Sequence, residues 1–203
     1  MKLYTSTTSP YSRIVMLGAL ARGMDDLQLV FADPWATPDA LVAVNPLSQV
    51  PALVTDGGAV ITNSAFIIDF LFGCPWREAA QAATAGYAYE LLDQVVKAYS
   101  LERFRLADAP AHPHIERARA AVARGLAHAP QLQAGSDTIE QHALGMALSY
   151  AHLRHPALWP HLPEANRLAF AQYEQRPDVR AVAIAQLEKH PTSIGALRLG
   201  AIE

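Results

Sequence analysis

The chain changes character once along its 203 residues, and this change limits its fold more than any other feature. Up to Gly73, short apolar runs typical of strands alternate with helical patterns. From Thr84 onward no run resembles a strand, and Ala, Leu, Arg and Glu recur at helical spacing. We therefore expect two domains, one at residues 1–76 that mixes strands with helices and an all-helical one at residues 84–203.

Strands and helices of the first domain are expected in the order βαβ, then α, then ββα. The expected strands are residues 2–5, 27–32, 52–55 and 59–62. Asp56-Gly57-Gly58 separates the last two, and Asp and Gly tolerate the positive φ that a tight turn requires. This spacing predicts a β-hairpin.

Two helices of this domain have clear starting signals. Ser9 can cap the first helix, and Pro10 suits its first position. Asn63-Ser64 provides the cap for the last helix of the domain. A weaker helical turn between them begins at Thr37-Pro38.

The second domain is expected to begin with a long helix and to contain a buried one. Tyr87, Leu91 and Val95 lie on adjacent faces of the long helix. Residues 138–141 read as a capping box, in which the Thr138 hydroxyl accepts from a backbone N–H and the Gln141 side chain reaches back. The apolar run that follows predicts a buried central helix.

Composition excludes several classes of protein. Lys and Arg number 16 against 19 Asp and Glu, so the chain lacks the excess of cations that binding to a nucleic-acid backbone needs. The single cysteine, Cys74, excludes an intramolecular disulfide, a redox pair and a cysteine-rich zinc site. The histidines lack spaced partner ligands, so we expect no metal. Without an apolar span or a secretory signal, the expected setting is cytoplasmic, with no membrane partner.

Three places in the first domain are candidates for ligand binding. The helix starts at Ser9 and at Asn63-Ser64 carry unpaired N–H groups that favour an anion, and their hydroxyls are donors. Pro51 stands at the head of a strand, where a cis Val50–Pro51 bond would turn the N–H and C=O of Val50 outward. Ordinary capping and a trans proline at an edge strand account for the same residues without a ligand.

Together these motifs resemble the cytosolic glutathione S-transferase superfamily, and its serine-type, bacterial-like branches in particular. The resemblance rests on Ser9-Pro10-Tyr11, Gln49-Val50-Pro51-Ala52-Leu53, Asn63-Ser64, Thr138-Ile139-Glu140-Gln141 and Arg176-Pro177, in that order. It implies a thioredoxin-like βαβαββα domain that binds glutathione, followed by an α-helical domain that carries a wall for a hydrophobic second substrate. It also implies a homodimer and a role in detoxification.

The resemblance assigns a role to each matched residue of the glutathione site. Ser9 would hydrogen-bond the glutathione sulfur and would be the catalytic residue. Val50 would pair with the cysteinyl backbone, presented by cis-Pro51, and Gln49 would lie near the glycyl end. The Asn63-Ser64 pair would hold the γ-glutamyl end, although Asn63 departs from the Glu or Gln that the family usually has there.

The second substrate is expected against Tyr11, Tyr99 and Phe104, with Tyr89 as a further wall residue. Three neighbours are alternatives to Ser9, namely Thr7, Thr8 and Ser12. The leading hypothesis is an enzyme that transfers the glutathione thiolate to a small hydrophobic electrophile, with lysis, isomerisation and peroxide reduction left open. A non-catalytic carrier or partner-binding protein of the same fold is the alternative, and Asn63 favours it.

Overall fold

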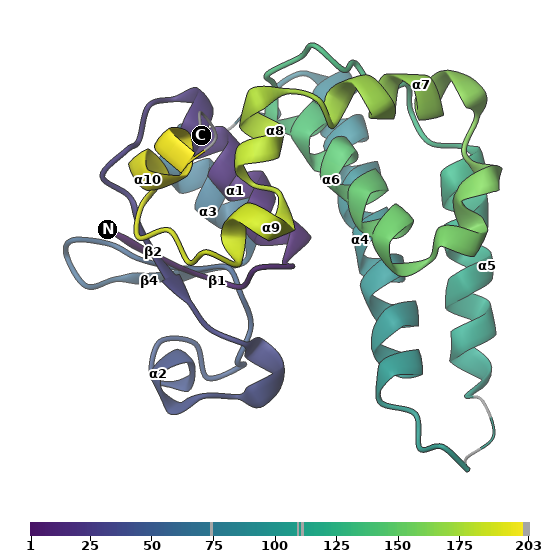
Figure 1. Cartoon of the computed structure of the whole chain (residues 1–203), viewed down its shortest axis with the longest axis horizontal. Helices are drawn as coiled ribbons and strands as arrows, with labels where there is room; N and C mark the ends of the chain where they lie inside the picture. Colours follow the sequence, from purple (N-terminus) through teal and green to yellow (C-terminus); the bar gives the residue numbers. More distant parts are fainter. Residues whose placement is uncertain (74, 109, 111, 201–203) are drawn as a thin grey trace.

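A computed structural model describes residues 1–73, 75–108, 110 and 112–200. A four-stranded mixed sheet with its helices forms the first part of the chain, and helices form the rest (Figure 1). The expected fold class, a thioredoxin-like βαβαββα unit followed by an α-helical one, is confirmed. Cys74 lies outside the described residues.

The sheet is built from four short strands in the order β2-β1-β3-β4. They are β1 (Lys2–Thr5), β2 (Gln28–Phe31), β3 (Ala52–Val54) and β4 (Val60–Thr62). Strand β1 pairs parallel with β2 and antiparallel with β3, which in turn pairs antiparallel with β4. The predicted hairpin joins β3 to β4, and Gly58 in its turn has a φ of 82°, which glycine adopts without a steric penalty.

The helices of this unit begin at or near the predicted positions, apart from the 3-10 helix, which the sequence did not predict. They are α1 (Pro10–Ala21), the 3-10 helix η1 (Pro34–Ala36), α2 (Asp39–Val42) and α3 (Ser64–Phe72). Because β1 and β2 are parallel, α1 must carry the chain back across the sheet between them. Helices α1 and α3 lie side by side, and α2 stands away from them (Figure 1).

Helices make up the remainder of the described chain. They are α4 (Ala79–Arg103), α5 (Pro113–Ala127), α6 (Ile139–Arg154), the 3-10 helix η2 (Pro156–His161), α7 (Glu164–Tyr173), α8 (Pro177–Ala181), α9 (Ile184–Leu187) and α10 (Ile194–Gly200). The long α4 and the buried α6 agree with the sequence prediction. Helix α6 packs against both α1 and α4, so it lies at the centre of the molecule (Figure 1). Among the described residues, every helix is too short or too polar to cross a membrane.

The predicted capping box at the start of α6 is wrong. Thr138 is the N-cap residue, but its hydroxyl lies 3.0 Å from the Ser136 hydroxyl and caps no backbone N–H. Gln141 Oε1 accepts a hydrogen bond from the Gln133 amide at 2.8 Å instead of reaching back to residue 138. The preceding loop therefore competes for both side chains, and a four-residue pattern cannot show this competition.

Hydrogen bonds of Arg13 and of the C-terminal segment are among the contacts that hold the sheet unit against the helices. Arg13 on α1 is 5% exposed, and its Nε donates to the Val182 carbonyl at 2.8 Å. Near the C-terminus, the Leu29 amide donates to the Thr192 carbonyl at 2.9 Å, and the Ile194 amide donates to the Leu27 carbonyl at 3.0 Å. The returning chain therefore covers the β2 edge of the sheet, which would otherwise expose unpaired backbone groups.

Candidate functional site

A cavity of about 1200 Å³ lies between the sheet unit and the helices. The loops after β1 and before β3, the start of α3, η1 and the facing sides of α4 and α6 form its lining. A cavity of this size between two structural units is a common place for a small-molecule ligand. The six predicted ligand-binding residues all line it: Ser9, Gln49, Val50, Pro51, Asn63 and Ser64.

Ser9 lies at the N-terminus of α1 and is 9% exposed. Its Oγ accepts a hydrogen bond from the Ser12 amide at 3.2 Å, which confirms the predicted cap. A hydroxyl can accept and donate at once, so this cap leaves the O–H proton available for a ligand. The positive end of the α1 dipole acts at the same place. The site therefore favours an anion next to Ser9.

The loop before β3 carries Gln49 and Val50 on the cavity wall. The Val50–Pro51 peptide bond is cis, as predicted. The buried Asn45 side chain donates from Nδ2 to the Gln49 carbonyl at 2.9 Å and so holds the loop in place. Pairing of β3 with β1 ends at Ala52, so Val50 lies outside the strand ladder.

Asn63 and Ser64 lie where β4 passes into α3. Asn63 has a φ of 67°, which Asn tolerates better than most residues, and its Oδ1 accepts from the Ala65 amide at 3.0 Å. This capping bond engages the carboxamide oxygen of Asn63. Ser64 is 3% exposed, and its hydroxyl lies beside that of Tyr89. Burial raises the pKa of Tyr89 to about 12, and the Ser64 hydroxyl acts against this rise.

One wall of the cavity combines aromatic rings with one carboxylate. The Tyr11 hydroxyl donates a hydrogen bond to the Asp93 carboxylate on α4. Burial is the main cause that raises the pKa of Tyr11 far above its ordinary value, and the hydrogen bond to Asp93 and the charge of that carboxylate raise it further. Tyr11 therefore stays protonated and cannot serve as a base. Its ring stacks on Tyr89 at 6.1 Å between centroids, and Trp76 meets Tyr89 edge-on at 6.2 Å.

Two predicted wall residues, Tyr99 and Phe104, do not line the cavity. The Arg154 guanidinium lies 4.1 Å from the Tyr99 ring and 5.1 Å from the Tyr150 ring, and Tyr150 is the one that lines the cavity. Phe104 follows the end of α4, is 57% exposed and packs on the cavity residue Trp35 at 5.0 Å. Tyr150 and Trp35 thus stand where Tyr99 and Phe104 were expected.

Sequence reasoning also missed Trp76 and Asp93 as cavity residues. Asp93 had a usable signal, because residues four apart share a face of a helix and Tyr89 was already a candidate. The alternatives to Ser9 differ in whether they line the cavity. Thr8 lines the cavity, whereas Ser12 is fully buried away from it with an unpartnered Oγ.

A second group of polar side chains lies away from the cavity. Asp137, His142 and Asp178 place ligand atoms within 4.8 Å of one another, an arrangement that could hold a metal ion. However, Arg176 donates to both carboxylates, and to Asp178 through two nitrogens at 3.0 and 2.8 Å. The guanidinium therefore already occupies both carboxylates and offsets one of their two negative charges. Burial lowers the pKa of His142 to about 4, and its Nδ1 lies 3.2 Å from the Tyr173 hydroxyl.

Comparison with known families finds a match in the first part of the chain. Residues 8–71 match the family model described as the glutathione S-transferase N-terminal domain. The matched stretch contains Ser9, Ser64 and every predicted ligand-binding residue between them. No curated protein matches the chain.

Solved structures resemble the chain over most of its length. A glutathione transferase family member from Pseudomonas fluorescens Pf-5, solved with bound glutathione, is 26% identical with a TM-score of 0.81, over 90% of this chain and 98% of that one. A glutathione S-transferase from Methylobacterium radiotolerans in complex with glutathione sulfonate is 23% identical with a TM-score of 0.65, over 90% and 93%. Gtt2 from Saccharomyces cerevisiae is 21% identical with a TM-score of 0.64, over 90% and 100%. The last two show a shared fold.

Proposed function

We propose that this chain binds glutathione and transfers the glutathione thiolate to a small hydrophobic electrophile. The chain belongs to the glutathione transferase superfamily. The observation that carries this proposal is the position and hydrogen bonding of the Ser9 hydroxyl. Its oxygen caps α1, its O–H proton is unused by that cap, and it lines the same cavity as Val50 and Ser64. The similar Pseudomonas fluorescens protein, solved with glutathione, supports the choice of ligand.

The chemistry requires only a preference for the thiolate. A free thiol has a pKa of about 8.5, and only its thiolate is a good nucleophile. Lowering that pKa by two units takes about 2.7 kcal/mol. A hydrogen bond from Ser9 to the sulfur anion, worth about 1.5–3 kcal/mol, and the α1 terminus, worth about 0.3–1 kcal/mol, together suffice. Ser9 acts as a donor and need not ionise.

The rest of the tripeptide follows the cavity wall. Val50, outside the strand ladder, has backbone groups for the cysteinyl residue of glutathione. The N-terminus of α3 at Ser64 suits the γ-glutamyl carboxylate, and Gln49 lies on the side assigned to the glycyl end. The hydrophobic electrophile then lies among Tyr11, Tyr89 and the other aromatic rings of the wall.

One observation favours a non-catalytic carrier instead. The Asn63 carboxamide oxygen is engaged by the Ala65 amide, so it is a poor partner for the γ-glutamyl ammonium group. Weak glutathione binding would follow. The same cavity could then hold an apolar ligand with no thiolate chemistry.

A calorimetric titration with glutathione, followed by a conjugation assay with chlorodinitrobenzene, separates the two functions. The enzyme is expected to bind glutathione and to release chloride faster than the uncatalysed reaction does. Absence of both glutathione binding and conjugation would refute the proposed function and support the carrier. Binding of glutathione without conjugation would refute the proposed transfer alone.

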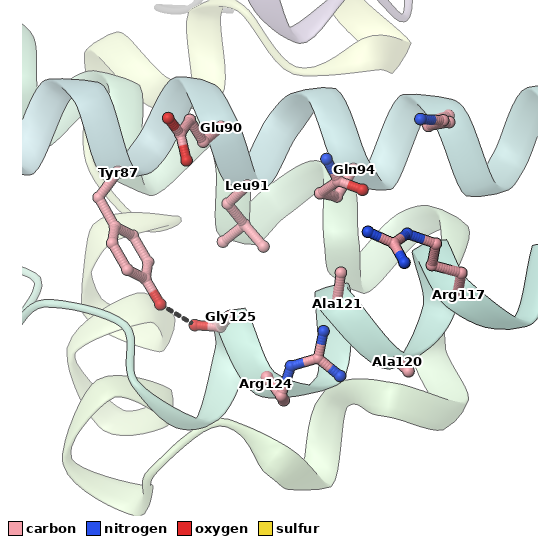
Figure 2. A pocket seen from close by; sticks show the side chains of 10 residues that line it. Tyr87, Glu90, Leu91, Gln94, Arg117, Ala120, Ala121, Arg124 and Gly125 are labelled. Atoms are coloured by element: carbon pink, nitrogen blue, oxygen red, sulfur yellow. Dashed lines mark hydrogen bonds between the residues drawn. The ribbon is translucent and has the colours of Figure 1, made fainter. Parts of the chain in front are cut away.

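The active form is proposed to be a homodimer, in which the first domain of one subunit contacts the long helices of the other. A groove of about 610 Å³ lies between α4 and α5, and Figure 2 shows Arg117 and Arg124 of α5 pointing into it. On α3, Phe66 and Phe70 lie one turn apart and are 66% and 54% exposed. Two exposed phenylalanines on one helix face are a typical contact surface.

Sedimentation tests this assembly directly. The wild-type chain is expected at twice its mass of 22.0 kDa, and Phe66→Glu with Phe70→Glu is expected at the monomer mass. Leu168→Glu is the matched control, because Leu168 on α7 is 61% exposed and lies on neither proposed surface. A wild-type monomer at micromolar concentration would refute the dimer.

A further inference from the structure

The cavity contains one fixed negative charge. Among the described residues that line it, the charged side chains are Asp93 and Lys97, one turn apart on α4. The Asp93 carboxylate accepts the hydrogen bond of Tyr11, two residues along the chain from Ser9. This bond holds the carboxylate beside the ring of Tyr11.

Lys97 is placed differently. It lines the cavity and also the separate groove between α4 and α5, so it stands on the ridge between the two. Lys97 is exposed, as Asp93 is, but its long side chain can keep the head group in water, whereas the hydrogen bond from Tyr11 holds the Asp93 carboxylate. Lys97 therefore compensates the charge of Asp93 only weakly at the position of the second substrate.

Aromatic rings line the same cavity as Asp93 and act in the same direction as its charge. Tyr11 stacks on Tyr89, Trp76 meets Tyr89 edge-on, and Tyr150 comes from α6. The face of an aromatic ring carries the negative part of its quadrupole, which attracts cations and repels anions. Flat apolar walls also favour a flat apolar guest.

We propose that the second-substrate part of this cavity selects uncharged or cationic aromatic electrophiles and discriminates against those that carry a carboxylate, with Asp93 as the specificity-determining residue. This inference rests on the proposed conjugation reaction and names its substrate class. An anionic substituent near the exposed Asp93 carboxylate meets a like charge beside aromatic rings, which costs about fivefold to tenfold in relative rate.

The test uses two electrophiles of nearly identical shape, a chlorodinitrobenzamide and the corresponding chlorodinitrobenzoate. For each, kcat/KM is divided by the uncatalysed rate with glutathione, and the benzoate value is then divided by the benzamide value. This ratio cancels any effect of Asp93 on the glutathione thiolate itself. The wild-type ratio is expected to be about one tenth, and Asp93→Asn is expected to raise it by about fivefold to tenfold.

Lys97→Met is the matched control, one turn away on the same helix, and it is expected not to raise the ratio. A wild-type ratio near one, or an Asp93→Asn ratio within twofold of the wild type, would overturn the inference. A ratio that falls more with Lys97→Met than it rises with Asp93→Asn would assign selectivity to the lysine and would also overturn it.

Failure of the proposed function is a distinguishable result. If the wild type conjugates neither electrophile, the two chlorine-free analogues are titrated against the fluorescence of Trp35 and Trp76, which line the cavity. Tighter binding of the benzamide analogue, lost in Asp93→Asn, supports the charge selectivity without any catalysis. Equal binding of both analogues refutes it.

Discussion

Replacing Ser9 by alanine tests the proposed chemistry most directly. The substitution removes the O–H donor that faces the cavity and the cap that accepts from the Ser12 amide at 3.2 Å. The lost bond to the thiolate is worth about 1.5–3 kcal/mol, and each 1.36 kcal/mol is a factor of ten in rate. We expect kcat/KM for conjugation at neutral pH to fall by about tenfold to a hundredfold.

The pH dependence identifies the origin of that fall. Without its donor, the bound thiol is deprotonated less readily, so its apparent pKa should rise and the variant should recover part of its rate at alkaline pH. The profile of kcat/KM against pH and the ultraviolet absorbance of the thiolate both measure this shift. Loss of the cap costs about 1 kcal/mol of folding stability, which is small against a usual total of about 5–15 kcal/mol.

Two further variants complete the experiment. Ser9→Thr keeps a hydroxyl and is expected to restore much of the rate. Ser12→Ala is the matched control, because the Ser12 hydroxyl is buried, unpartnered and outside the cavity lining. Unchanged activity in Ser9→Ala would refute the reasoning and would direct attention to Thr8. A lower rate with no shift of the thiol pKa would mean that Ser9 acts only as a helix cap.

The other predictions concern stability. Gly145→Ala should lower the unfolding free energy by about 1–3 kcal/mol, since the added Cβ would overlap the buried Tyr173 ring. Gly86→Ala has open space around the added Cβ and should raise the unfolding free energy by about 0.5–1 kcal/mol. Urea unfolding measures both changes. Burial holds the pKa of His142 near 4 against its ordinary 6.5, so the unfolded state binds the proton more readily, and the unfolding free energy should fall by about 3 kcal/mol as the pH drops from 6.5 to 4. His142→Gln should flatten that slope, and an equally steep one would contradict the assignment. Arg176→Met should cost about 2 kcal/mol or more, because it leaves two carboxylates beside each other without their cation; a loss below 0.5 kcal/mol would show that solvent already screens them.

Local sequence signals predicted most of the first unit because each depends on a few neighbouring residues. Ser9 and Pro10 place the start of α1, and Asn63 places the start of α3, through caps that need only the adjacent backbone. Asp56-Gly57-Gly58 places the hairpin, since its turn needs a positive φ and a single glycine, Gly58, can supply one. Ser9, Asn63 and Ser64 of the proposed glutathione site lie at these same helix starts, so their grouping could be anticipated from the order of elements.

The walls of the cavity depend on tertiary structure. Helix α4 has 25 residues, and the way it packs against α5 and α6 decides which of its side chains reach the cavity. That packing places Tyr89 and Asp93 in the lining of the same cavity as Ser9 and leaves Tyr99 against Arg154. Helical spacing alone identifies a face of α4 but not the neighbour that the face meets.

The sequence by itself determined the elements, their order and the polar helix starts, because capping, turn and periodicity preferences act over a few residues. Only the tertiary structure decided the contact of Tyr11 with Asp93, 82 residues apart, and the failure of the Thr138 capping box. Both depend on groups that are distant in the chain or compete in space for the same hydrogen bond. The substrate selectivity proposed above therefore depends on a contact between the sheet unit and α4 that no local pattern contains.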